Sequence, residues 1–262
     1  MNKIGILGGG NMGTAIISRV FKQYSLAVCE KDSGRARDLK KKFKAAVLDP
    51  KALIQKSDII ILAVKPQDME GVLAEIKIFL DKKNIFFISI AAGLTTGFFE
   101  KRLGAGSRVI RAMPNMPAQI GEGVTALCKG RFASGKDLKT AEKIFAGIGE
   151  TVIVDEDLMD SVTAVSGSGP AYVFLFVECF LKAAEGLGLE KTTAQKLVAA
   201  TLRGSVDLLL RSKEEAADLR AKVTSKGGTT QAAMDVFLRH NIEKTFVQAV
   251  AAAKKRAGEL RQ

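Results

Sequence analysis

The first part of the chain alternates short apolar runs with stretches of helical periodicity. Up to about residue 155 the runs are rich in β-branched residues and nearly continuous in apolar character, which is typical of strands buried on both faces. The clearest runs lie at 4–7, 26–29, 59–64 and 85–90, and further candidates lie at 107–111, 123–128 and 150–154. Buried strands separated by helices indicate parallel strands with crossover connections. This part is therefore predicted to be an α/β domain with a doubly wound sheet of the Rossmann type.

The remainder of the chain has the pattern of long helices and almost no strand signal. Helices are predicted at 171–186, 192–212, 214–224, 229–241 and 242–260. The change of pattern places a boundary between 155 and 160, and we expect one domain over 1–157 and an all-α domain over 158–262. The apolar runs 173–177 and 208–210 suggest burial beyond a single chain, so we predict an obligate homodimer held by the all-α domain.

Composition and charge narrow the class of protein. The 262 residues are 47% hydrophobic and 26% charged, which suits a globular chain of two domains. The formal net charge is +12, but the basic residues are dispersed apart from 40–42 and 254–256, and no aromatic platform lies among them. Both runs fall in helical segments, where they are most simply solvated faces. We expect no nucleic-acid partner.

The cysteines and the N-terminus bear on the compartment. Cys29, Cys128 and Cys179 have apolar neighbours and no CxxC spacing, which predicts buried free thiols in a reducing compartment. Met1 runs almost directly into the first strand, without the pattern of a signal peptide. The most apolar stretch, 171–184, is interrupted by two charged residues and is predicted to be too short to span a bilayer. We expect a soluble cytoplasmic protein with no membrane partner and, because metal-ligand spacing is absent, no metal.

A glycine-rich turn follows the first predicted strand and opens a helix over 14–23. In a dinucleotide-binding turn, the first glycine permits the tight turn, the second lets the backbone approach a pyrophosphate, and the third lets the helix pack on the strand. The N–H groups at the helix N-terminus then bind the phosphates. A simple glycine-rich turn is the alternative, but the position after a strand favours a dinucleotide. The predicted contacts here are Gly8, Gly10, Asn11, Met12 and Gly13.

Glu30 ends the second strand about 20 residues after that turn, where an acidic side chain binds the ribose 2′-hydroxyl of NAD. Its carboxylate would repel the 2′-phosphate of NADP, whereas Lys31, Ser33 and Arg35 would attract that phosphate. Glu30 could also be an exposed turn residue. The cofactor is therefore predicted as NADPH or NADH.

Two further strands end in small residues. Open α/β sheets bind ligands at the carboxyl ends of their strands, and small side chains leave room there for a nicotinamide ribose and ring. Simple strand exits are the alternative interpretation. The predicted contacts are Ala63, Val64, Lys65, Pro66, Ala91, Ala92 and Gly93.

Three proline- or glycine-containing segments follow. Pro114 and Pro117 would rigidify a turn. The segment 166–170 fits a loop with its proline in the first turn of the next helix, and packing and substrate contact are equally open for it. The segment 225–230 lies between two helices and offers N–H groups and hydroxyls to a carboxylate, with an ordinary helix cap as the alternative.

Five motifs in order resemble those of the pyrroline-5-carboxylate reductases. They are Ala63–Gln67, Ser89–Gly93, Arg111–Pro117, Ser166–Tyr172 and Thr224–Thr230. The resemblance implies NAD(P)H-dependent reduction of the cyclic imine 1-pyrroline-5-carboxylate to L-proline, the last step of proline biosynthesis. It also implies a dimer, possibly a ring of dimers, whose site takes the cofactor from one chain and part of the substrate loop from another. The net positive charge would help to attract both anions.

The resemblance assigns roles to residues of the helical half. Thr230 is the candidate catalytic residue, as hydrogen-bond donor to the imine nitrogen. The predicted substrate-binding residues are Ser225, Gly228, Thr229, Thr230 and Glu156.

The sequence departs from the family pattern at Lys226, where proline is usual, at Ala221, where an acidic residue is common, and at 49–50, where an asparagine is frequent. The departures leave open a non-catalytic dinucleotide-binding scaffold. A second alternative is a 3-hydroxyacid dehydrogenase, but the turn 169–173 lacks the lysine that such enzymes carry on the following helix. His240 has no motif around it and is predicted to be a surface or helix-end residue.

Overall fold

The computed structural model describes residues 3–80 and 84–261, and its contacts divide them into two compact units. One unit consists of the residues up to 170 together with those from 252, and the other of 171–251. The boundary predicted after residue 157 differs from this division. Met159 and Ala164 are fully buried, and Met159 packs on the sheet residues Ala126 and Cys128, so the segment after 157 belongs to the first unit by its contacts.

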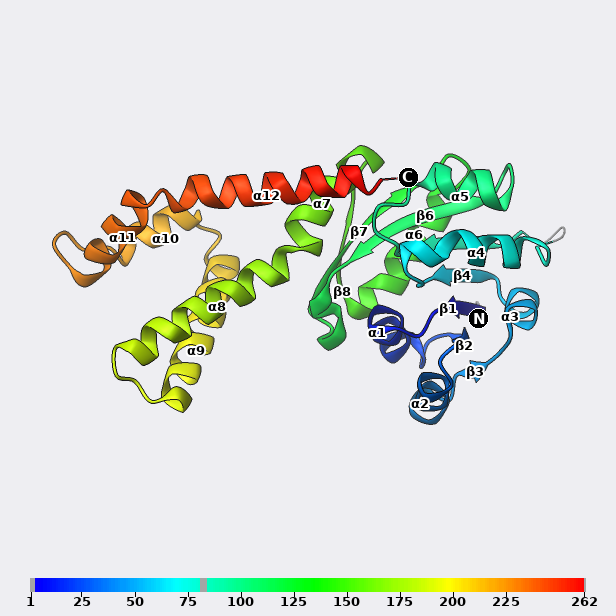
Figure 1. Cartoon of the computed structure of the whole chain (residues 1–262), viewed down its shortest axis with the longest axis horizontal. Coiled ribbons are helices and arrows are strands. Elements are labelled where there is room, and N and C mark those ends of the chain that lie inside the picture. The colour runs from blue at the N-terminus through cyan, green and yellow to red at the C-terminus, as the bar shows by residue number, and fades with distance from the viewer. Residues whose placement is uncertain (1–2, 81–83, 262) are drawn as a thin grey trace. The chain divides into compact units, whose positions relative to one another are not determined.

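The first unit is built on an eight-stranded sheet of order β3-β2-β1-β4-β5-β6-β7-β8 (Figure 1). The strands are β1 (Lys3–Leu7), β2 (Ser25–Cys29), β3 (Ala46–Val47), β4 (Ile59–Leu62), β5 (Phe86–Ser89), β6 (Arg108–Pro114), β7 (Gly123–Lys129) and β8 (Gly149–Ile153). All of the predicted strands are present, and the Rossmann-type sheet is confirmed. The edge strand β3, only two residues long, was not predicted.

One pair of strands corrects the expectation of a parallel sheet. β6 and β7 pair antiparallel, whereas the other pairs are parallel. Only a short 3-10 segment, Met116–Ile120, connects them. A parallel connection needs a crossover of a dozen or more residues, so the short link forces the chain to reverse.

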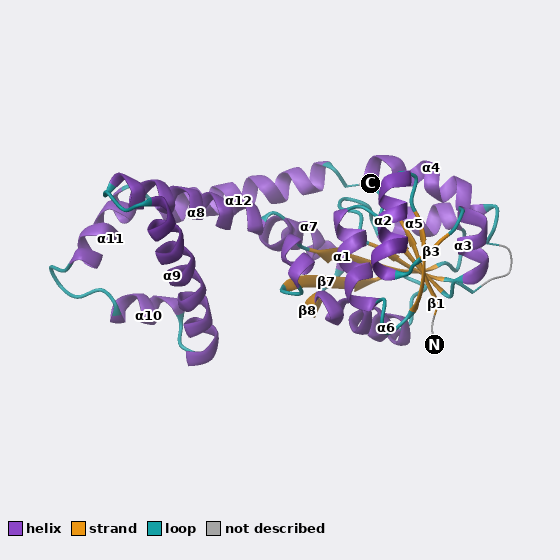
Figure 2. Ribbon diagram, turned by 90° about the horizontal axis from the view of Figure 1, so that it is seen from below, coloured by secondary structure: helices purple, strands orange, loops and turns teal. Residues whose placement is uncertain are grey.

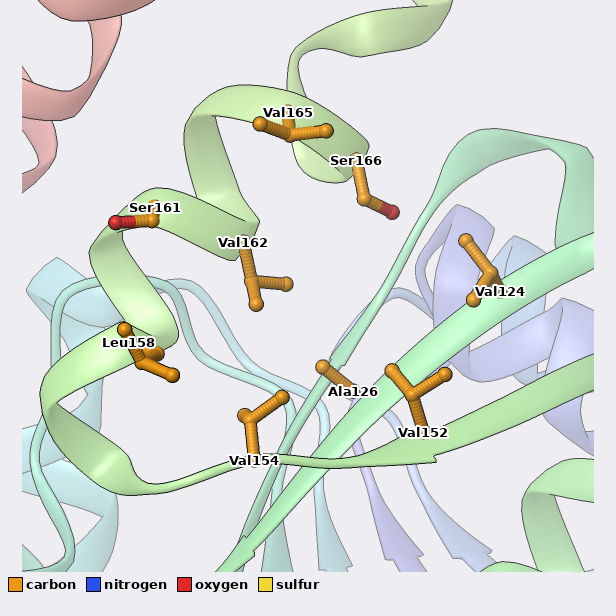
Figure 3. Close-up of a pocket in the computed structure, with 9 residues that line it drawn as sticks. All are labelled: Val124, Ala126, Val152, Val154, Leu158, Ser161, Val162, Val165 and Ser166. Atoms are coloured by element: carbon orange, nitrogen blue, oxygen red, sulfur yellow. The ribbon is translucent and has the colours of Figure 1, made fainter. Parts of the chain in front are cut away.

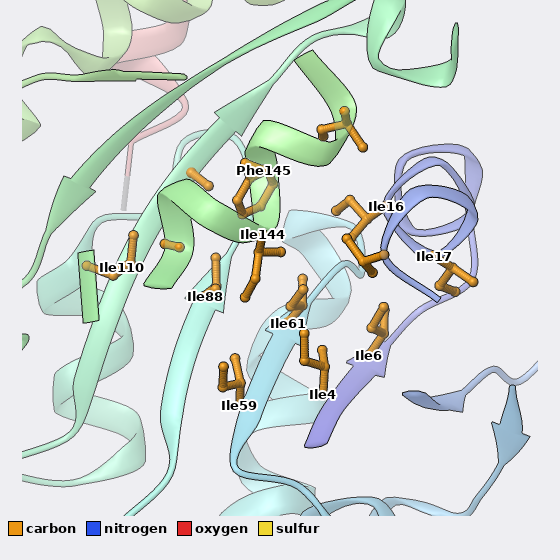
Figure 4. Packing of buried hydrophobic residues seen from close by; sticks show 14 of the residues in the cluster. Ile4, Ile6, Ile16, Ile17, Ile59, Ile61, Ile88, Ile110, Ile144 and Phe145 are labelled. Atoms are coloured by element: carbon orange, nitrogen blue, oxygen red, sulfur yellow. The ribbon is translucent and has the colours of Figure 1, made fainter. Parts of the chain in front are cut away.

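Helices cover both faces of the sheet. Those of this unit are α1 (Asn11–Val20), α2 (Ser33–Phe43), α3 (Pro50–Lys56), α4 (Pro66–Lys77), α5 (Thr96–Leu103), α6 (Gly135–Phe145) and α7 (Met159–Val162). Alternate strand residues face opposite layers: Ile59 and Ile61 pack with α1 and α6 (Figure 4), whereas Ile60 and Leu62 pack with α3, α4 and α5. Burial on both faces explains the continuous apolar runs.

The segment 166–170 is not the predicted loop. Residues 163–167 form one turn of π-helix, in which the Ser168 N–H donates to the Thr163 carbonyl at 2.8 Å, and α8 (Gly169–Gly186) follows directly. Pro170 lies in the first turn of α8 as predicted, where its missing N–H leaves no bond unmade. A Cβ on Gly167 would lie 2.5 Å from the Met113 Cε, so glycine lets this turn approach β6.

The second unit is entirely helical, and the strands of the described chain all lie in the first unit (Figure 2). The last five helices of the chain, all predicted within a few residues, are α8 (Gly169–Gly186), α9 (Lys191–Ser212), α10 (Ala216–Lys222), α11 (Thr229–Arg239) and α12 (Ile242–Glu259). By its contacts the first unit includes the start of α8 and the end of α12, and the rest of these helices belongs to the second unit. Few apolar residues of this unit are buried, and Phe174, Leu175 and Leu210 are 51%, 61% and 73% exposed. The prediction that these runs are uncovered in a single chain is confirmed.

Two expectations about this unit need correction. Cys179 is exposed rather than buried, because the α8 surface on which it lies is uncovered in the single chain. The helical run Glu156–Gly186 is, among the described residues, long and apolar enough to cross a membrane by length and composition, so the argument that the apolar stretch is too short does not hold. A second copy of the chain that covers the exposed apolar surface would also explain it.

Candidate active site

Gly8 and Gly10, in the turn between β1 and α1, and Gly13, in the first turn of α1, serve different purposes. Gly8 has φ +100°, and a Cβ there would lie 2.6 Å from the Ala63 carbonyl oxygen. A Cβ on Gly13 would lie 2.3 Å from the Gly8 carbonyl oxygen. Gly10 has no atom within 4 Å of its Cβ position. Gly8 and Gly13 are therefore needed for packing, whereas Gly10 leaves its surroundings open, as the approach of a pyrophosphate requires.

The N-terminus of α1 is suited to an anion. Gly10 is the N-cap residue, no side chain caps the helix, and the first turn contains no acidic residue. The N–H groups of the first turn and the positive end of the helix dipole are therefore available to a phosphate.

Glu30 holds the glycine turn in place. The Gly9 N–H donates to Glu30 Oε2 at 2.6 Å, and the Asp32 N–H donates to Glu30 Oε1 at 2.8 Å. Its side chain is only 7% exposed, so the alternative of an exposed turn residue is wrong. Arg35 Nη2 lies 3.7 Å from Glu30 Oε1, and its Nε lies 4.0 Å from Asp32 Oδ1. The end of β2 therefore presents two carboxylates, Glu30 and Asp32, beside the guanidinium of Arg35.

The sheet places the predicted cofactor segments together. Leu7 of β1 is in register with Leu62 of β4, which is in register with Ser89 of β5. The glycine turn, 63–66 and 91–93 follow these three adjacent parallel strands, so they lie along one edge of the sheet. Lys65 is the N-cap residue of α4 and Pro66 opens that helix, while Ala91 is buried and Gly93 has φ +77°.

Glu156 lies in the first unit and is bound to the protein itself. The Thr96 N–H donates to Glu156 Oε1 and the Thr96 hydroxyl donates to Oε2, both at 2.7 Å. Arg111, a fully buried residue of β6, lies 3.5 Å from Oε1 and 3.9 Å from Asp160. These bonds favour a structural or positioning role over the predicted contact with substrate. Sequence reasoning missed the cluster, although an arginine within a buried strand was a signal that a carboxylate partner must exist.

The other predicted substrate residues lie in the second unit. Gly227 has φ +72°, and Gly228, the N-cap residue of α11, donates its N–H to the Ser225 carbonyl at 3.0 Å. No side chain caps α11, and Thr229 and Thr230 form its first turn. The segment 225–230 is thus a helix N-terminus with free N–H groups, hydroxyls and the exposed cation Lys226. These groups favour a carboxylate-binding role over the alternative of an ordinary capped helix end.

An apolar pocket lies beside β7 and β8 in the first unit (Figure 3). It has a volume of about 320 Å³, and its lining includes Val124, Val152 and Val162. Only two serines bring polar atoms to it, so it offers no group for acid–base chemistry.

The remaining reactive side chains do not form a catalytic centre. Burial, and after it the Glu156 carboxylate, raises the pKa of the Cys128 thiol to about 12, and burial also raises the pKa of Cys29. Neither is a thiolate nucleophile at neutral pH. His240 is exposed at the C-terminal end of α11, as predicted. Across residues 3–80 and 84–261, no cluster of three metal-ligating side chains occurs.

A Rossmann unit with an open pyrophosphate cradle, joined to an all-helical unit, defines a nicotinamide-dinucleotide-dependent oxidoreductase. Residues 3–93 match the family model described as "NADP oxidoreductase coenzyme F420-dependent", and residues 156–260 match "Pyrroline-5-carboxylate reductase dimerisation". The second match begins close to the predicted domain boundary.

Relatives and solved structures agree over the whole chain. The pyrroline-5-carboxylate reductase of Mycobacterium tuberculosis is 37% identical, with 100% of this chain and 97% of the relative covered, and that of Synechocystis is 37% identical, with 98% of each covered. The structure of the Coxiella burnetii enzyme has a TM-score of 0.91 at 36% identity, covering 100% of this chain and 99% of that one. The Plasmodium falciparum enzyme, solved with NADP bound, has a TM-score of 0.89 at 30% identity, covering 100% and 98%. The chain belongs to the pyrroline-5-carboxylate reductase family.

Proposed function

We propose that this protein uses NADPH or NADH to reduce 1-pyrroline-5-carboxylate to L-proline, the last step of proline biosynthesis. The observation that carries the proposal is the open cradle at Gly10 in a chain that matches reductases of this substrate from end to end. The NADP-bound Plasmodium structure supports the cofactor.

The bound cofactor supplies a hydride to the imine carbon. The chain binds its pyrophosphate at residues 8–13, and the small residues at 63–64 and 91–93 leave room for the nicotinamide. We propose that Ser225, Gly228 and Thr229 bind the substrate carboxylate. The Thr230 hydroxyl donates a hydrogen bond to the lone pair of the neutral imine nitrogen. Overall the carbon gains one hydride from the cofactor and the nitrogen gains one proton from water, and a substrate that arrives as the iminium ion has already taken up that proton. Because a cyclic imine can arrive already protonated, orientation is the main contribution of these residues.

The test is oxidation of NADPH and NADH by the purified protein, followed through the loss of nicotinamide absorbance when pyrroline-5-carboxylate is added. We expect turnover that depends on the imine. Cofactor binding without turnover would point to a scaffold instead, and turnover with 3-hydroxyacids but not with the imine would point to a hydroxyacid dehydrogenase. The segment Gly169–Val173 offers no lysine for the latter.

The family match supports oligomerisation through the helical unit, and we propose an obligate homodimer that assembles further into a ring of dimers. Large apolar residues of α8 and α9 are about half exposed or more in the single chain, and a dimer would bury them. We expect sedimentation to detect no monomer at assay concentrations. An active monomer would contradict this proposal.

We propose further that the protein is soluble and cytoplasmic and binds neither membranes nor nucleic acid. Burial of the apolar helix 156–186 by a second copy would account for its composition without a bilayer. Sedimentation with lipid vesicles tests this, and the protein is expected to stay in the supernatant.

A further inference from the structure

The turn between β5 and α5 carries the proposed nicotinamide contacts Ala91, Ala92 and Gly93. It is held at its far end by Glu156, because the Thr96 N–H and hydroxyl each donate to one oxygen of the same carboxylate at 2.7 Å. Two bonds from one residue fix both the position and the direction of the chain at Thr96.

Side-chain capping of α5 from within its own sequence comes from the residue before Thr96, and Glu156 adds a partner for the Thr96 N–H. Thr95 is the N-cap residue of that helix, and its own hydroxyl accepts the Phe98 N–H at 3.1 Å. Glu156 approaches from another part of the sequence, 60 residues away. Its effect is therefore to fix where the turn lies relative to the rest of the sheet.

Arg111 connects that carboxylate to the sheet. Its side chain is 2% exposed and lies 3.5 Å from Glu156 Oε1, and its backbone is in register with Ser89 at the end of β5. Arg111 thus connects β5, which leads into the turn, with Glu156, which holds the end of the turn: its backbone pairs with β5 and its buried guanidinium lies beside the carboxylate. Asp160, 3.9 Å from Arg111, is the second carboxylate beside it.

The C-terminal segment supports the same turn from another side. A Cβ on Gly93 would lie 2.8 Å from the Leu260 carbonyl oxygen, and Arg261 lies 3.4 Å from Asp157 and 3.9 Å from Asp160. The turn is therefore held by the carboxylate cluster at one end and contacted by the end of the chain at Gly93.

We infer that Glu156 is a positioning residue for hydride transfer: by binding Thr96 on one side and Arg111 on the other, it sets the place of the 91–93 turn and with it the nicotinamide ring. The inference rests on the proposed function. It gives Glu156 a role through the protein rather than direct contact with substrate. Displacing the turn by a fraction of an ångström changes the distance over which hydride passes, while the pyrophosphate cradle on β1 is untouched.

The test is Glu156→Gln, which removes the charge beside Arg111 and one of the two acceptors for Thr96. We expect kcat to fall by about tenfold or more, with cofactor Kd changed by less than about threefold. The primary deuterium isotope effect on kcat, measured with cofactor deuterated at the transferred position, should rise because hydride transfer becomes slower than the other steps. Loss of folded protein alone would lower the active fraction and leave this isotope effect unchanged.

Two further variants keep the test decisive. Glu70→Gln is the matched control, because Glu70 also pairs with a residue of α5, Arg102, at 2.9 Å. The Glu70 side chain is 73% exposed, and Arg102 lies near the opposite end of α5 from Thr96. In this variant kcat and the isotope effect should stay at wild-type values. If Glu156→Gln does not fold, Thr96→Val removes only the hydroxyl bond at similar volume and should change kcat and the isotope effect in the same direction, by a smaller amount.

Wild-type protein is assayed with the imine first, since an inactive wild type overturns the proposed function and this inference together. An active wild type, with both kcat and the isotope effect unchanged in Glu156→Gln or in its substitute Thr96→Val, overturns this inference alone.

Discussion

Thr230→Ala is expected to lower kcat on the order of 10²-fold while cofactor affinity stays within about a factor of two of wild type. Thr230 lies in the first turn of α11, in the unit that does not contain the glycine turn, so its loss leaves the cradle intact. The hydroxyl is the proposed donor to the imine nitrogen, and without it the imine is neither oriented nor polarised for hydride addition. Steady-state kinetics with the imine and fluorescence titration with NADPH or NADH measure the two effects.

Thr230→Ser is the matched variant, because it keeps the hydroxyl and removes only a methyl group. It should retain most of the wild-type kcat. Wild-type kinetics in Thr230→Ala would reject the assignment of Thr230.

Gly10→Ala is expected to weaken cofactor binding by more than about tenfold, with the free energy of unfolding changed by less than about 1 kcal/mol. The added methyl meets no protein atom within 4 Å, so the fold tolerates it, but it occupies the space that a pyrophosphate must enter. Calorimetric titration with the cofactor and thermal unfolding without it separate the two effects.

Gly13→Ala and Gly71→Ala bracket that result. A Cβ on Gly13 would overlap the Gly8 carbonyl oxygen, so this variant should lose both stability and cofactor binding. A Cβ on Gly71, in α4, also meets nothing within 4 Å, and alanine there should leave cofactor affinity unchanged and stabilise the helix by up to about 1 kcal/mol. Normal cofactor affinity in Gly10→Ala would mean that the pyrophosphate does not bind at this turn.

Much of the fold was predictable because local pattern and burial agree. The runs 4–7, 59–64 and 85–90 are nearly continuous in apolar character, and the structure buries most of their residues between two helical layers. The strand β7 was predicted, but its antiparallel direction was not, because the direction of a strand depends on the connection before it, which the apolar pattern does not report. The glycines and serines of 166–170 favour turns and so predict a loop, whereas the structure continues the helical backbone through a π-helical turn, with Gly167 close to the end of the Met113 side chain.

The candidate site was predictable in part. The cradle residues have a local signature, because the spacing of their glycines directly after a strand can be read from the sequence. The contact that requires glycine at position 8 is with the Ala63 carbonyl oxygen, which only the fold brings there. The Glu156 cluster has no local signature, since Thr96, Arg111 and Glu156 meet only through the tertiary fold. The exposure of Cys179 could not be predicted from its neighbours along the chain either. Apolar neighbours indicate burial, but a single chain leaves that surface uncovered.

The central claim is that the cradle of one chain and the 225–230 segment of another chain together form each active site. The direct measurement is the activity of mixed dimers that pair one Gly10→Ala chain with one Thr230→Ala chain, purified through two different tags and assayed at a cofactor concentration near the wild-type Kd, where a site with Gly10→Ala is largely empty. If the site is shared between chains, one site of each mixed dimer has an intact cradle and an intact Thr230, and we predict about half of the wild-type activity per dimer. If verified mixed dimers are as inactive as either parent, each site lies within a single chain and the account is contradicted.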